Sequence, residues 1–82
     1  MNNGINGLRE KIDRIDDSIV ELLKHRASIA SEIIDLKKNS SINVEDVSRE
    51  NSIIQRLCEK NPEIASLIKE VYGRIFNWVK SR

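Results

Sequence analysis

The chain has 82 residues, and its 14 Lys and Arg against 13 Asp and Glu give a formal net charge of +1. A charge this close to zero gives no reason to expect a nucleic acid or an anionic membrane surface as partner. Hydrophobic residues make up 39% and charged residues 33%, a balance typical of a helical protein in water. We expect a single domain over residues 1–82, with a thin core unless the chain oligomerises.

Cysteine use and hydropathy indicate where the protein works. The one cysteine, Cys58, cannot form an internal disulfide and suits a reducing compartment. No apolar run approaches membrane-spanning length, and the first ten residues have no signal-peptide core. We therefore expect a soluble, cytoplasmic protein. The sequence contains neither a metal-ligand cluster nor a Gly-rich phosphate loop, so no metal or cofactor is predicted.

The first predicted element is a long amphipathic helix, from residue 5 or 8 to residue 38. Apolar residues recur there at alternating steps of three and four, the pattern of a helix that packs along one stripe. These residues are Ile5, Leu8, Ile12, Ile15, Ile19, Leu22, Ile29, Ile33 and Leu36. So long a helix cannot bury its stripe within this short chain, and we expect an intertwined homodimer.

Arg26 interrupts this apolar stripe, and Lys37 follows it on the same stripe eleven residues later. Eleven residues make three turns plus roughly 20°, with a rise of about 16 Å. A guanidinium in such a seam costs several kcal/mol in desolvation unless an anion meets it. Two cations in one interface indicate a buried anion site. The structural alternative is that Arg26 pairs with a carboxylate of another helix, reaches water, or sets the helix register.

Two shorter helices are predicted after a loop at residues 39–43, so the fold class is all-α. Asp46 or Ser48 can cap the second helix. Asn61-Pro62-Glu63 predicts the start of the third, with Asn as the cap, Pro at the first helical position and Glu favourable to the helix dipole. The apolar faces are predicted to carry Ile53, Ile54 and Leu57 in the second helix, and Ile64, Leu67, Ile68, Val71, Ile75 and Val79 in the third.

A second polar group opens the second helix. Asp46, Arg49 and Glu50 stand at positions i, i+3 and i+4, so they are predicted to share one face of its first turn. Such a trio is typical of a solvated helix start. If the loop brings it over the Lys37 end of the first helix, two cations and two acids surround one small volume.

From Leu8 to its C-terminus the chain resembles the all-helical, type II chorismate mutases. The resemblance is carried by LREKID, by an arginine seventeen residues after Arg9, by a lysine eleven residues further on, and by D-x-x-R-E from Asp46. The family is an intertwined helical homodimer that converts chorismate to prephenate by a Claisen-type rearrangement without a cofactor. The resemblance therefore implies an isomerase of the shikimate pathway, which leads to Phe and Tyr, with chorismate as its substrate.

The spacing of Arg9 and Arg26 indicates whether one chain can hold both in a single site. Seventeen residues place Arg9 about 25 Å from Arg26 along the helix and about 100° around it. If both serve one site, Arg9 must come from a second subunit whose long helix runs antiparallel. The resemblance implies that Arg26 and Arg9 of the partner subunit hold the two substrate carboxylates, to which planar guanidinium groups are well suited. It also implies that Lys37 faces the breaking ether bond, where negative charge develops in the transition state.

The remaining site residues come from the other helices. The resemblance implies that Glu50 accepts the substrate ring hydroxyl beside the backbone of Asp46, and that Arg49 completes the cationic lining. Val79 departs from the family pattern, which has a Ser there and a Gln or Glu four residues on, one residue past Arg82. Either the chain is trimmed there, or the domain continues into a fusion partner, or the enzyme lacks that hydrogen bond to the ether oxygen. Loss of such a donor costs about a hundred- to a thousandfold in rate.

Other functions of the same chain stay open on the sequence. One is a weakly active, mutase-like regulatory or ligand-binding domain, fused to or activated by another enzyme of the shikimate pathway. A second is an isochorismate pyruvate-lyase of the same fold. A third is a helical interaction module, although nothing in that role requires buried cations beside an acid.

Overall fold

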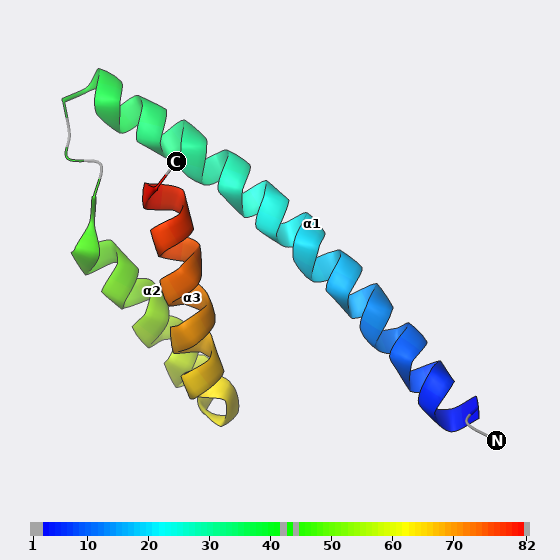
Figure 1. Ribbon diagram of the computed structural model, residues 1–82. Coiled ribbons are helices and arrows are strands. Elements are labelled where there is room, and N and C mark those ends of the chain that lie inside the picture. Colours follow the sequence, from blue (N-terminus) through cyan, green and yellow to red (C-terminus); the bar gives the residue numbers. More distant parts are fainter. Residues whose placement is uncertain (1–2, 42, 44, 82) are drawn as a thin grey trace. The chain divides into compact units, whose positions relative to one another are not determined.

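The computed structural model describes residues 3–41, 43 and 45–81 as three α-helices and one short 3-10 turn (Figure 1). The helices are α1 (Asn3–Asn39), α2 (Val47–Lys60) and α3 (Ala65–Lys80), and the 3-10 turn η1 (Pro62–Ile64) precedes α3. The described residues contain no strand, so the predicted all-α class with one long and two shorter helices is confirmed. None of these helices is both long enough and apolar enough to cross a membrane.

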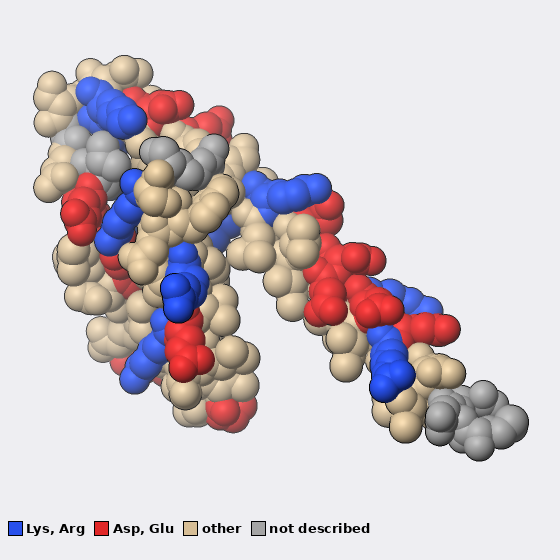
Figure 2. Space-filling model, viewed as in Figure 1, with Lys and Arg blue, Asp and Glu red and all other residues tan. Residues whose placement is uncertain are grey.

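Residue contacts divide the chain into two compact units, Met1–Glu32 and Ile33–Arg82. The first consists of most of α1, which has 37 residues and begins before the predicted residue 5. Its apolar stripe is exposed, with Ile15 at 58% and Leu22 at 68%. Lys and Arg alternate with Asp and Glu on the visible face of this helix (Figure 2), and Lys24 forms a surface ion pair with Glu21 at 2.9 Å. Surface pairs of this kind stabilise a helix only slightly. The apolar stripe of α1 has no cover among the described residues of the single chain.

The C-terminus of α1 belongs to the second unit and is closed by backbone hydrogen bonds. The Ser40 N–H donates to the carbonyl oxygens of Leu36 at 3.1 Å and Lys37 at 3.2 Å. Ser41 has φ 58°, a left-handed conformation that ends many helices and that favours glycine. Of the predicted loop at residues 39–43, Asn39 is the last helical residue, and position 42 lies outside the described part of the chain.

The second unit is organised around the packing of α2 against α3, which lie side by side with opposite chain directions (Figure 1). Its buried side chains are Ile53 of α2 and Ile68 and Phe76 of α3. Tyr72 packs edge-on against Phe76, with ring centroids 5.8 Å apart. Ile53 and Ile68 lie on the predicted apolar faces and are buried, whereas Ile64, Leu67 and Val71 of the predicted third-helix face are exposed.

The prediction that the Asn61 side chain caps the third helix is wrong. The Asn61 side chain does not cap that helix; its Nδ2 donates to the carbonyl oxygen of Leu57 at 3.0 Å and so closes α2. Pro62 then opens the 3-10 turn, and α3 begins only at Ala65. The Nδ2 contact orients the Asn61 amide toward the last turn of α2, and Oδ1 makes no capping hydrogen bond to the 3-10 turn.

Candidate active site

The predicted site residues lie on all three helices. Arg9, Arg26 and Lys37 belong to α1, Asp46 precedes α2, Arg49 and Glu50 lie in its first turn, and Val79 lies near the end of α3. Arg26 and Lys37 are half-buried, whereas Arg9 is exposed. The uninterrupted helix between Arg26 and Lys37 confirms that no break separates the two cations. Their joint use in one anion site stays a prediction.

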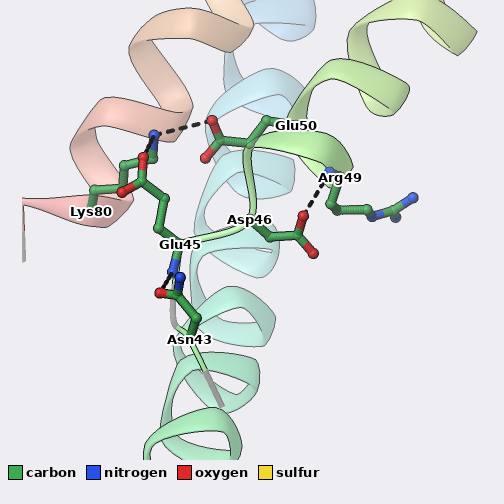
Figure 3. Close-up of polar contacts among 6 residues, drawn as sticks. All are labelled: Asn43, Glu45, Asp46, Arg49, Glu50 and Lys80. Carbon is green, nitrogen blue, oxygen red and sulfur yellow. Dashed lines mark hydrogen bonds and ion pairs between the residues drawn. The ribbon is translucent and has the colours of Figure 1, made fainter.

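The start of α2 is built by local hydrogen bonds. Asp46 is its cap: Oδ1 accepts the Arg49 N–H at 2.8 Å, and the backbone carbonyl accepts the Glu50 N–H at 3.1 Å. Before the cap, Oδ1 of Asn43 accepts the Glu45 N–H at 3.2 Å (Figure 3). Of the two predicted caps, Asp46 is therefore the one used, and its side chain is occupied by the helix start.

The three polar residues of this turn do not act as one group. The Arg49 side chain extends away from the Glu50 carboxylate (Figure 3), because consecutive helical residues point about 100° apart. The prediction that Asp46, Arg49 and Glu50 share one face is therefore wrong for Arg49 and Glu50, whose side chains point in different directions (Figure 3). Asp46 caps, Arg49 is exposed, and Glu50 is half-buried with 22% of its side chain exposed.

Glu50 is paired with Lys80, a residue that the sequence did not indicate. The Lys80 Nζ lies 3.1 Å from Oε1 of Glu50 and 3.3 Å from Oε1 of Glu45 (Figure 3). The hydrogen bond to Glu50 is the largest of the effects that raise the pKa of Lys80; burial opposes it, and Glu45 adds to it. No helical or loop period connects these positions, so only the packing of α3 against α2 shows the contact.

Val79 precedes Lys80 and is half-buried. Its isopropyl group has no donor or acceptor, so the end of α3 contributes the Lys80 ammonium to the polar cluster and Val79 only apolar surface. The described residues hold no group of three His, Cys, Asp or Glu side chains arranged to bind a metal ion. The polar groups that the structure brings together at the end of α3 are the Lys80 ammonium and the carboxylates of Glu45 and Glu50.

Comparison with known proteins assigns this arrangement to a class. Residues 8–82 match the family described as chorismate mutase type II, so the chain belongs to that family and the resemblance seen in the sequence is confirmed. It is similar to a bifunctional chorismate mutase/prephenate dehydratase of Aquifex aeolicus, with 36% identity over 69 residues, 84% of this chain and 17% of the relative.

A second relative is a chorismate mutase of Methanocaldococcus jannaschii, 35% identical over 57 residues, which are 66% of this chain and 58% of the relative. The chain thus spans less than two thirds of the length of either relative. No solved structure matches it.

Proposed function

We propose that residues 1–82 form one chorismate mutase domain, which converts chorismate to prephenate by an intramolecular Claisen-type rearrangement. The observation that carries this proposal is the family match over residues 8–82. The relative from Methanocaldococcus jannaschii is itself named a chorismate mutase. On this proposal the protein is an isomerase of the shikimate pathway that needs neither a metal nor a cofactor.

The substrate is a dianion, so its carboxylates require fixed cations. We assign one to Arg26 and the other to Arg9 of the partner subunit, because both guanidinium groups cannot reach one small molecule within a single helix. This makes the active protein a homodimer with antiparallel α1 helices. The exposed apolar stripe of α1 supports the assignment, since a second copy of the chain would cover it.

Lys37 is assigned to the chemical step. The carbon–oxygen bond of the enolpyruvyl ether breaks while a carbon–carbon bond forms, and negative charge collects on the ether oxygen in between. A fixed ammonium group stabilises that charge more than it stabilises the substrate, so its main effect is on kcat. Lys37 is half-buried, and a partly desolvated cation interacts more strongly with an anion than one in bulk water.

Glu50 is assigned to the ring hydroxyl of chorismate. The rearrangement transfers no proton, so the carboxylate acts as a hydrogen-bond acceptor that fixes the orientation of the substrate. Asp46 supports this residue by fixing the first turn of α2, with its backbone carbonyl on the Glu50 N–H at 3.1 Å. The family resemblance also assigns Arg49 to the site as a further cation, and Val79 stands where the family pattern has a Ser.

One of the two relatives carries the matching region as part of a longer, bifunctional protein. The Aquifex aeolicus relative carries its match in a longer, bifunctional chain, of which this one covers 17%. We therefore propose that the domain works either alone or joined to another enzyme of the same pathway. The lone Cys58 suits a reducing compartment, and we place the activity in the cytoplasm.

Incubation with chorismate tests the proposal directly. We expect chorismate to disappear and prephenate to be the product identified by NMR, with Lys37→Ala as the control of much lower kcat. A parallel incubation with isochorismate would release pyruvate if the chain were a lyase. A folded dimer that leaves chorismate unchanged refutes the proposal.

A further inference from the structure

Lys80 has no role in the mechanism proposed above, yet it forms the ion pair that joins α3 to the start of α2. We propose that Lys80 is a positioning residue, which holds the Glu50 carboxylate in the orientation that receives the substrate ring hydroxyl. This inference rests on the proposed function. In it, Lys80 fixes the orientation of the Glu50 carboxylate before the substrate binds.

The contact is well suited to orient a carboxylate. The Lys80 Nζ lies 3.1 Å from Oε1 of Glu50, while the structure records no partner for Oε2 among the described residues. One oxygen is thus held by a charged donor and the other keeps its lone pairs for an incoming hydroxyl. A carboxylate can accept several hydrogen bonds at once, so the ion pair and the substrate do not compete for the same oxygen.

The burial of Glu50 makes a partner necessary. Its side chain is 22% exposed, and a carboxylate taken that far out of water loses solvation unless a charge or a donor replaces it. Arg49 is the cation next to it in sequence, but its side chain extends in another direction (Figure 3). Lys80 therefore supplies the compensating charge from α3.

Glu45 is a second carboxylate paired with the Lys80 ammonium. It lies 3.3 Å from the same ammonium group, so two carboxylates are held by one cation (Figure 3). Without Lys80, two acids would face each other, and repulsion would turn Glu50 away. Glu45 is the more exposed of the two acids, at 56%, and water can solvate it in place of Lys80. Loss of Glu45 should therefore matter less than loss of Lys80.

A purely structural role is the competing explanation, in which the pair only ties α3 to α2. The two explanations differ in which quantity falls when Lys80 is removed and Glu50 is kept: kcat/KM if Lys80 orients the carboxylate, and the free energy of unfolding if it only ties the helices. If Lys80 acts through Glu50, its removal changes nothing further once Glu50 is neutral. If Lys80 only ties the helices together, its removal lowers the free energy of unfolding without a selective effect on catalysis.

The test is a double-mutant cycle on kcat/KM for chorismate, with Lys80→Met and Glu50→Gln singly and together. We expect Lys80→Met to lower kcat/KM about tenfold, since a catalytic group displaced by about 1 Å can cost up to a hundredfold. In the Glu50→Gln background the same change should have almost no effect. Glu45→Gln should cause a smaller loss, and Lys80→Arg, which keeps the charge, should restore most of the activity.

Lys69→Met is the matched control, because Lys69 is an exposed lysine of the same helix with no recorded ion pair. It should leave kcat/KM unchanged. Circular dichroism and urea unfolding of each variant identify any loss that comes from folding. Equal effects of Lys80→Met in both backgrounds, or wild-type activity in Lys80→Met, would overturn the proposal.

NMR titration of the Lys80 ammonium gives a readout that does not depend on turnover. We expect the raised pKa of Lys80 to fall in Glu50→Gln and to fall less in Glu45→Gln, because Glu50 is the larger cause of the shift. An unchanged titration in Glu50→Gln would show that the pair is absent in solution. A wild-type chain without chorismate turnover refutes the proposed function as well, whereas an active wild type with an unaffected Lys80→Met variant refutes this inference alone.

Discussion

Replacement of Ile15 by Gln tests the proposed homodimer most sharply. Ile15 lies on the apolar stripe of α1 and is 58% exposed in the single chain. In a monomer, an exposed substitution of this kind changes the free energy of unfolding by less than about 0.5 kcal/mol. In a dimer whose interface includes the stripe, the same change removes apolar area from two subunits.

The size of the effect follows from the exposed fraction. Complete burial of an Ile side chain contributes about 1.5–3 kcal/mol, so the exposed 58% of Ile15 contributes about 0.9–1.7 kcal/mol when a second subunit covers it. Two copies lose about 1.7–3.5 kcal/mol for each dimer, which weakens association by about 20- to 300-fold.

Sedimentation equilibrium over a range of micromolar concentrations measures this directly. We expect twice the 9.4 kDa chain mass for the wild type and dissociation of Ile15→Gln within that range. Asp17→Gln is the matched control, because Asp17 lies about 200° around the helix from Ile15 and faces solvent. A wild-type monomer that turns over chorismate would refute both the dimer and the shared site, and equal effects of the two substitutions would refute the role of the stripe.

Four further predictions concern the site and the end of α1. Arg9→Ala and Arg26→Ala are each expected to be inactive, and mixing them should restore about a quarter of wild-type activity through heterodimers with one intact site, as measured by chorismate turnover after subunit exchange. Lys37→Ala should lower kcat by more than it raises KM, because the lost cation faces charge that develops only in the transition state. Glu50→Gln should keep appreciable kcat/KM where Glu50→Ala does not, because an amide oxygen can still accept the substrate hydroxyl. Ser41→Gly should raise the free energy of urea unfolding by about 0.5–1 kcal/mol, since φ 58° strains any residue with a Cβ.

Each of these predictions has an outcome that contradicts it. Persistent inactivity after demonstrated exchange would place Arg9 and Arg26 in the same subunit's site, or in none. An effect of Lys37→Ala confined to KM would assign the lysine to ground-state binding. Equal loss in folded Glu50→Gln and Glu50→Ala would mean that charge, and not hydrogen bonding, is the contribution of Glu50. Unchanged stability of Ser41→Gly would show that the left-handed turn carries no strain.

The helical class and the positions of the predicted site residues along the helices followed from the sequence, because both depend on local periodicity. Alternating steps of three and four mark one face of a helix wherever they occur, and a short side-chain oxygen before a helix caps it, as Asp46 does. The family motif likewise depends only on spacing along the chain. The same local rules placed the start of α1 too late, since an established helix can extend through Gly4 and Gly7 at a modest cost.

Tertiary structure decided which of these residues meet. The pairing of Lys80 with Glu50 joins positions of different helices, and no sequence period relates them. The use of Asn61 to close α2 likewise depended on which of two adjacent helix ends its amide reached. Contacts between helices are set by how their apolar faces pack, here around Ile53, Ile68 and Phe76, and the charged side chains at the rim meet only where that packing brings them together.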